Sequence, residues 1–170
     1  MAGLNHGVHM VESVIEIRRN IAMIAEGYGG SKDWNYENSF DNFDENTNKC
    51  NKFVYDVTTE AGASPGTPNG FLGNSPPTAG QWADPKYSIK GWKIVSKPQR
   101  GDVVAYAHNY SDATGHVAII GANVVGYRSN IQYSIGTSGT YKSIARTGFG
   151  FDATLKPSSS TYIYRRYVGR

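Results

Sequence analysis

The period of the hydrophobic pattern changes part-way along the chain, and this change constrains the fold more than any other feature. Near the N-terminus, apolar residues recur at alternating spacings of four and three, which is typical of one face of an α-helix. Gly27 follows them and is a suitable helix end. From residue 103 onward, short apolar runs separated by turn residues predict β-strands instead. The sequence therefore predicts an α+β fold. The helical stripe comprises Met10, Val14, Ile17, Ile21 and Ile24.

The predicted strands cover residues 103–106, 116–121, 123–129 and 130–135, and residues 161–168 form a closing strand. In the closing strand we expect Arg165 and Arg166 to lie on a solvated face. Residues 62–99 hold six of the seven prolines, so we expect an ordered connection there with little regular structure.

The 170 residues fit one domain with a real core. We divide residues 1–170 into an N-terminal helical segment (1–30), a middle part with a second helix and the connection (31–99), and a sheet (100–170). A single domain of this kind needs no disulfide framework, and one cysteine cannot form one within the chain.

That one cysteine, Cys50, stands where a polar loop gives way to helical spacing. Phe53, Val54, Val57 and Ala61 continue the pattern, and Gly62 can end the helix. The partial positive charge at a helix N-terminus lowers the pKa of a thiol, especially with an imidazole nearby, so Cys50 is a candidate nucleophile. The alternative is a small buried hydrophobic residue.

His116 is the best-placed partner among the four histidines, because it follows Gly115 at the start of an apolar strand. His6 and His9 lie near the N-terminus, and His108 lies in a loop. A structural histidine is the alternative for His116. A zinc site at His108, Asp112 and His116 is a weaker alternative, because their equal spacing falls in a loop without helical pattern.

Charge and hydropathy exclude several classes of protein. The net charge of +3 arises from 17 basic and 14 acidic residues with no long basic run, which disfavours a dedicated nucleic-acid binder. A mildly basic surface would still suit an anionic wall polymer. Charged residues interrupt the first thirty positions, so we expect no signal peptide and no membrane span. Phosphate-binding loops and the serine-hydrolase elbow are absent from the sequence.

The segments "KCNKFVYDVTTEAGA", "PPTAGQWADP" and "IKGWKIVSKPQRGDVVAYAHNYSDATGHVAIIG" together resemble the NlpC/P60-type cysteine peptidases and amidases, over roughly residues 50–121. They are most similar to the antibacterial amidase toxins of that group, which are delivered by type VI secretion or carried at the end of Rhs proteins. Cys50 and His116 match the nucleophile and the base. The sequence departs from the common motif beside the nucleophile, where Lys49, Asn51 and Lys52 stand.

The resemblance implies a papain-like fold, with N-terminal helices packed on an antiparallel sheet, and a third polar residue that orients the imidazole. By spacing Ser129 is the candidate, and Asn130, Gln132 and Ser134 remain open. The loop 29–49 and the proline-rich region would wall the substrate groove, with Trp34 and Trp82 in it.

The same resemblance implies hydrolysis of peptidoglycan stem peptides, at the bond between D-glutamate and diaminopimelate or at the muramoyl–L-alanine amide, with no metal or organic cofactor. It also implies export from the cytoplasm by a secretion system, action in the periplasm of target bacteria, and a cognate immunity protein. "AGL" at positions 2–4 is similar to the end of the segment at which Rhs carriers release their toxins. The alternatives are a non-catalytic wall-binding module and a thiol acyltransferase of the same fold.

Overall fold

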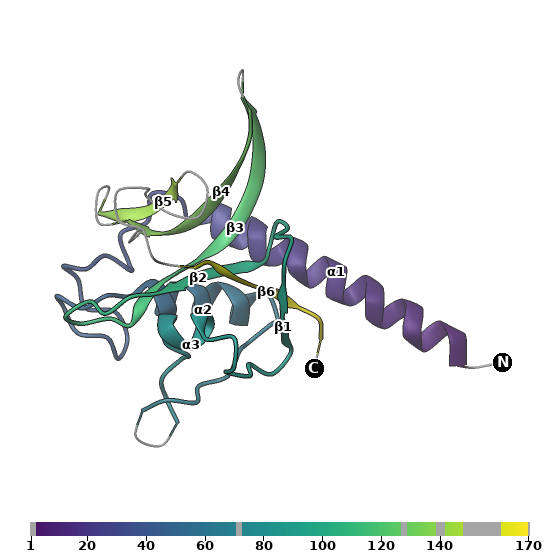
Figure 1. The fold of residues 1–170 in the computed structure, drawn as a ribbon, viewed down its shortest axis with the longest axis horizontal. Coiled ribbons are helices and arrows are strands. Elements are labelled where there is room, and N and C mark those ends of the chain that lie inside the picture. Colours follow the sequence, from purple (N-terminus) through teal and green to yellow (C-terminus); the bar gives the residue numbers. More distant parts are fainter. Residues whose placement is uncertain (1–2, 71–72, 127–128, 139–141, 148–160, 170) are drawn as a thin grey trace.

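A computed structural model describes residues 3–70, 73–126, 129–138, 142–147 and 161–169, and their side chains except at 3–12, 123–126, 129–133 and 146–147. Within these residues the strands form one antiparallel sheet with the order β1-β6-β2-β3-β4-β5 (Figure 1). The helices are α1 (Gly3–Gly27), α2 (Cys50–Glu60) and α3 (Ala79–Ala83). The strands are β1 (Trp92–Val95), β2 (Val103–Ala107), β3 (Gly115–Gly126), β4 (Ser129–Ser138), β5 (Ser143–Thr147) and β6 (Ile163–Tyr167). The predicted α+β class is confirmed.

The main core lies between one face of the sheet and residues from all three helices. Alternate residues of a strand point to opposite faces. Two odd-numbered residues each from β2 and β3 enter this core: Val103, Ala105, Val117 and Ile119. Their even-numbered neighbours form a smaller cluster on the other face, against which Tyr162 and Tyr164 pack: Val104, Tyr106, Ala118 and Ile120. Burial of apolar surface in the main core fixes the helices on the sheet. Its central members include Ile21, Phe53, Val54, Val57, Trp82, Val103, Ala105, Val117, Ile119 and Ile135.

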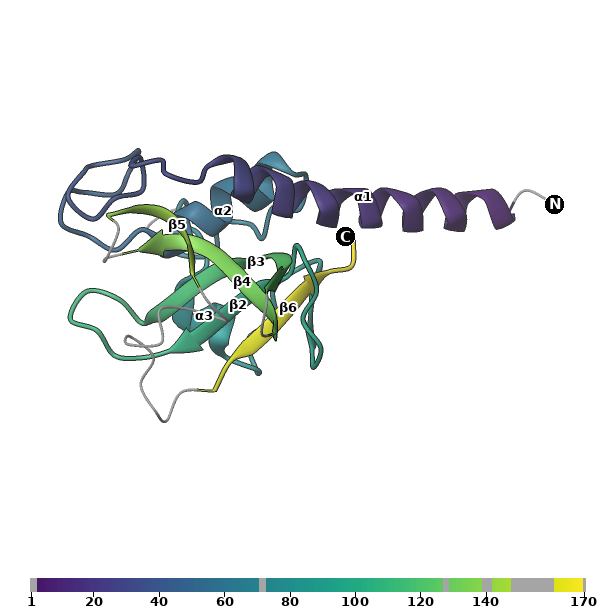
Figure 2. The same ribbon diagram turned by 90° about the horizontal axis from the view of Figure 1, so that it is seen from above.

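Helix α1 confirms the predicted stripe from Val14 onward, because Ile21 is fully buried and Val14, Ile17 and Ile24 pack against the core. The side chain of Met10 lies outside the described ones. The N-terminal part of α1 projects beyond the sheet (Figures 1 and 2). No helix in the described part of the chain is long and apolar enough to cross a membrane. Helix α1 also touches the turn before β2, where Gly101 has φ +89° and an added Cβ would lie 2.1 Å from the Arg18 carbonyl oxygen.

The prolines did not prevent regular structure in the connection. Helix α3 begins after Pro77 at a capping box, in which the Thr78 hydroxyl accepts from the Gln81 N–H and the Gln81 side chain accepts from the Thr78 N–H. Strand β1 follows in the same region. Our prediction of little regular structure for residues 62–99 missed both elements. Separately, the strand predictions did not include β5.

The prediction of a solvated face at Arg165 and Arg166 is wrong. Arg165 is 2% exposed, and its guanidinium donates to the carbonyl oxygens of Trp82, Asp84 and Tyr87 at 2.6–2.9 Å. It thereby satisfies carbonyl groups at and beyond the C-terminal end of α3. Arg166 forms a bidentate pair with the buried Asp102 at 2.9 and 2.7 Å.

Trp82 is also misplaced by the sequence prediction. It is 1% exposed and packs edge-on against Trp92, with ring centroids 5.1 Å apart. Trp82 is therefore a core residue and does not wall a groove.

Candidate active site

Cys50 is the first residue of α2 and lies in the core with only 4% exposure. Its sulfur lies within reach of three backbone N–H groups, those of Val117, Asn51 and Cys50 itself, and these favour the thiolate. Val117 belongs to β3 and follows His116 directly. The nucleophile candidate and the strand segment that carries His116 are therefore neighbours.

Burial decides the ionisation of this thiol. Desolvation raises the pKa of Cys50 to about 11, the three N–H groups oppose this rise, and the charge of Asp112 adds to it. Our prediction of a lowered pKa is therefore wrong for the protein without substrate. Desolvation also lowers the pKa of His116 to about 4. At neutral pH both groups are uncharged.

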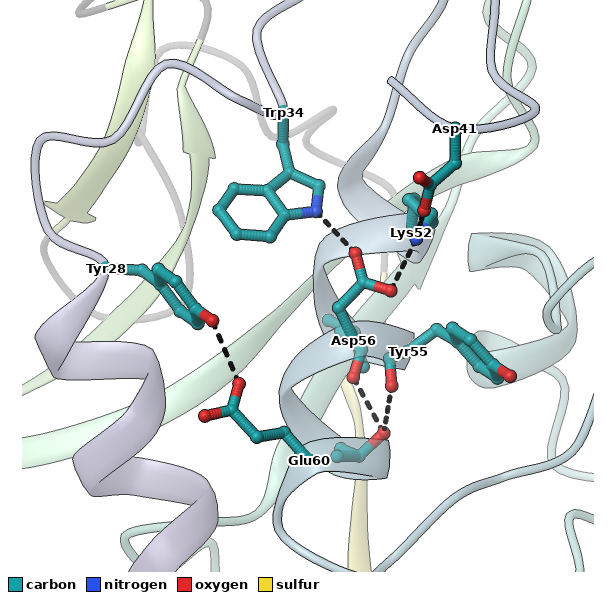
Figure 3. Close-up of polar contacts among 9 residues, drawn as sticks. Tyr28, Trp34, Asp41, Lys52, Tyr55, Asp56 and Glu60 are labelled. Atoms are coloured by element: carbon teal, nitrogen blue, oxygen red, sulfur yellow. Dashed lines mark hydrogen bonds and ion pairs between the residues drawn. The ribbon is translucent and has the colours of Figure 1, made fainter.

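Two lysines beside Cys50 hold the preceding loop against α2. Lys49 is 1% exposed, and its Nζ donates to the carbonyl oxygens of Asp44 and Thr47 at 2.8 and 3.0 Å. Lys52 pairs with Asp41 at 2.6 Å and with Asp56 at 2.5 Å (Figure 3). These contacts occupy the positions where the sequence departs from the common NlpC/P60 motif.

The indole of Trp34 reinforces this attachment. Its Nε1 donates to Asp56 at 2.7 Å (Figure 3). The ring packs edge-on against Tyr28 and Phe53. Trp34 is 4% exposed and borders a neighbouring pocket of ≈ 210 Å³ rather than the cleft at Cys50. It is chiefly a core residue that fixes the loop.

A cleft of ≈ 340 Å³ opens at Cys50. Residues 42–44, 47 and 48 of the loop form one wall, Thr78 and Ala79 at the start of α3 form a second, and residues 112–114 between β2 and β3 form a third. Both segments that we expected around the groove thus contribute to it, although through residues other than Trp34 and Trp82.

Hydrogen bonds join these walls. The Asn48 side-chain amide donates to both carboxylate oxygens of Asp112 at 2.8 Å, which links the loop before Cys50 to the β2–β3 connection. The Gly80 N–H donates to the Thr114 hydroxyl at 2.9 Å, which links α3 to the same connection. The sequence suggested Asp112 only as a metal ligand, and no motif in it pointed to Asn48.

His116 is the second residue of β3 and pairs with Tyr106 of β2. The ring centroids of His116 and Tyr106 are 6.2 Å apart. His108 instead lies beyond β2 with its ring 4.4 Å from that of Tyr110. Within the described residues no three His, Cys, Asp or Glu side chains are grouped to hold a metal ion.

The backbone register argues against Ser129 as the residue that orients His116. Ser129 opens β4 opposite Gly126, at the far end of β3 from His116, and its side chain lies outside the described ones. At about 3.3 Å per residue, the two positions are roughly 30 Å apart along the strand. Asn130 and Gln132 lie in the same distant part of β4, also with side chains outside the described ones.

The register favours the other end of β4. Ser134 is fully buried opposite Ile120. Continuing the antiparallel pairing toward the start of β3 brings His116 level with Ser138, which is 9% exposed. Sequence spacing did not point to Ser138, because β3 and β4 extend beyond the apolar runs from which that spacing was taken.

A cysteine that opens a helix packed on an antiparallel sheet, next to a strand beginning Gly-His, defines the class of papain-like cysteine peptidases and amidases. The CHAP domain model matches residues 39–136, more than half of the sequence, and the chain belongs to this family of cysteine peptidases and amidases. The predicted enzyme class, a cysteine hydrolase of amide bonds, is confirmed.

Two solved structures are similar. The structure of Ly7917 with the hydrolyzing product of MDP has a TM-score of 0.51 at 15% identity, over 88% of this chain and 62% of the Ly7917 chain. The type VI effector–immunity complex Tae3–Tai3 from Ralstonia pickettii gives a TM-score of 0.49 at 17% identity, over 89% of this chain and 98% of that one. At this level of identity the likeness to Ly7917 supports the fold. No curated protein sequence matches the chain.

Proposed function

We propose that the protein hydrolyses an amide bond in peptidoglycan stem peptides, with Cys50 as nucleophile and His116 as general base. The observation that carries this proposal is the Cys50 thiol at the N-terminus of α2, in a cleft beside β3, in a chain of the CHAP family. Ly7917, which shares the fold, was solved with the hydrolyzing product of MDP, and this supports the substrate class.

The reaction starts from two neutral groups. As the sulfur attacks the carbonyl carbon, the thiol proton passes to the imidazole of His116. The backbone N–H of Cys50 and the positive end of α2 stabilise the oxyanion. Collapse of the tetrahedral intermediate breaks the C–N bond, and His116 returns the proton to the leaving amine. Water, deprotonated by His116, then hydrolyses the thioester and restores the thiol.

A third residue that orients the imidazole completes this scheme. In place of Ser129 we propose Ser138, because continuing the β3–β4 register brings it level with His116. A hydroxyl that accepts a hydrogen bond from one ring nitrogen would fix the tautomer in which the other nitrogen accepts the thiol proton.

Within the substrate, the bond between D-glutamate and diaminopimelate is our first candidate, and the muramoyl–L-alanine amide is the second. We further propose that the protein is an antibacterial effector, exported to act in the periplasm of target bacteria and neutralised by an immunity protein that covers the cleft. These proposals rest on the sequence resemblance to amidase toxins. Growth arrest on periplasmic expression, absent with Cys50→Ala, would test the effector role.

The decisive experiment is mass spectrometry of purified muropeptides incubated with wild-type protein, with Cys50→Ala and with His116→Ala. We expect a hydrolysed product only with the wild type, and its mass identifies the bond. No product from the folded wild type, combined with wall binding that Cys50→Ala leaves intact, would favour the non-catalytic module instead.

A further inference from the structure

The cleft at Cys50 is acidic although the whole chain carries a net charge of +3. Its charged lining residues are Asp44 and Asp112, and no Lys or Arg lines it among the described residues. Lys49 lies next to Cys50, but it is buried and its Nζ is bound to carbonyl oxygens. The sign of the local charge therefore differs from that of the whole molecule.

Asp112 is the acidic residue whose charge acts on the nucleophile. Asp112 is an exposed residue, and the Asn48 side chain orients its carboxylate by donating hydrogen bonds to both oxygens at 2.8 Å. Among the ion pairs of the described residues none engages Asp112. Asp112 and Cys50 line the same cleft, and the negative charge of Asp112 adds to the rise in the pKa of the thiol.

A negative charge held at this position opposes formation of the thiolate, so it weakens the nucleophile of the resting enzyme. A carboxylate that disfavours the thiolate in the empty site has a use if the substrate carries a positive charge that compensates it. The hydrogen bonds from Asn48 also order the Asp112 carboxylate before a ligand binds, which reduces the conformational entropy lost on binding.

We propose that Asp112 is a specificity-determining residue that binds an ammonium group of the substrate close to the scissile amide. The proposal rests on the proposed function, which supplies the amide. Within stem peptides, the free side-chain amine of an uncrosslinked diaminopimelate has this chemistry. A bound ammonium also cancels the field of Asp112 at the sulfur, so binding of the correct substrate makes thiolate formation easier.

The first test needs no peptidoglycan, because Cys50 is the one cysteine of the chain and can be labelled selectively. Alkylation rates are measured with cationic bromoethylamine and with anionic iodoacetate, and their ratio is compared between wild type and Asp112→Asn. Both reagents react with the same thiolate, so a change in the thiol pKa alters both rates equally and leaves their ratio unchanged. Glu45→Gln is the matched control, because it removes an equal charge from an exposed residue outside the cleft.

We expect the cation-to-anion rate ratio to fall by roughly three- to tenfold in Asp112→Asn, the range expected for unit charges a few ångströms apart in a water-exposed cleft. Glu45→Gln should leave the ratio within twofold, and added salt should reduce the difference between wild type and Asp112→Asn. An unchanged ratio in Asp112→Asn overturns the proposal.

A second test compares muropeptides with a free and with an N-acetylated diaminopimelate side chain. We expect the wild type to lose about tenfold in kcat/KM on acetylation and Asp112→Asn to treat both alike. Equal cleavage of both peptides by wild type refutes the ammonium site and leaves the proposed function standing. Cleavage of neither peptide, with a charge-dependent alkylation ratio, refutes the proposed function and leaves the cation preference of Asp112 intact.

Discussion

The ionisation state of Cys50 gives the sharpest prediction, because it separates two ways in which a cysteine and a histidine can work together. In one, the resting enzyme holds a thiolate–imidazolium pair. In the other, both groups are neutral until the substrate binds. Burial favours the second, with the pKa of Cys50 near 11 and that of His116 near 4.

The expected labelling rate of Cys50 follows from the pKa of its thiol. At pH 7 a thiol with a pKa of about 11 is a thiolate in about one molecule in ten thousand, against about one in a hundred at the ordinary value of 9.0. We therefore expect iodoacetamide to label native Cys50 at least a hundredfold more slowly than a free cysteine at pH 7. The 4% exposure of the residue slows labelling further.

The assay is alkylation of the native protein followed by intact-mass spectrometry from pH 6 to pH 10, with circular dichroism to confirm folding at each pH. We expect the rate to rise about tenfold per pH unit with no plateau in this range. His116→Ala should give the same slope, because the neutral imidazole does not generate the thiolate. A fast rate that levels off below pH 8 and disappears in His116→Ala would refute the argument from desolvation.

Three further predictions concern stability. Arg165→Met should lower the free energy of unfolding by about 3 kcal/mol in urea titrations, because carbonyl groups near α3 lose their buried donor; a loss below 1 kcal/mol would contradict this role. His116 has a folded pKa near 4, below the unfolded value of 6.5, so the unfolded chain takes up the proton first. Stability should be complete above pH 6.5 and fall by up to about 3 kcal/mol as the pH drops to 4, and His116→Gln should lack this dependence. Gly101→Ala should destabilise by more than 1 kcal/mol in the same titration, because of its positive φ and the close Arg18 carbonyl; an unchanged midpoint would show that the turn relaxes.

The helical periodicity predicted α1 and α2 well, because each buries a regular stripe that the sequence displays directly. Short elements escaped prediction. Helix α3 has five residues and β1 has four, too few for a period to appear, and both depend on contacts with distant parts of the chain.

In the candidate site, too, features set by neighbouring residues could be predicted, whereas contacts between residues far apart in the sequence could not. The position of Cys50 at a helix start is local and was predicted correctly. The burial that raises its pKa, the carbonyl groups that bind Arg165 and the clamp between Asn48 and Asp112 all join residues far apart in the chain. The register that separates Ser129 from His116 depends on where the β3–β4 hairpin turns, which apolar spacing alone does not reveal.

The position of β6 in the sheet has a consequence for how the molecule is made. Although β6 comes last in sequence among the strands that the structure describes, it lies between β1 and β2, and its Arg165 binds carbonyl groups at the end of α3. Until the ribosome has released residues 163–167, β1 and β2 have no common partner and α3 lacks its anchor. Because α3 supplies one wall of the cleft, we expect a nascent chain to have no complete site, so that activity begins only after synthesis has passed this strand.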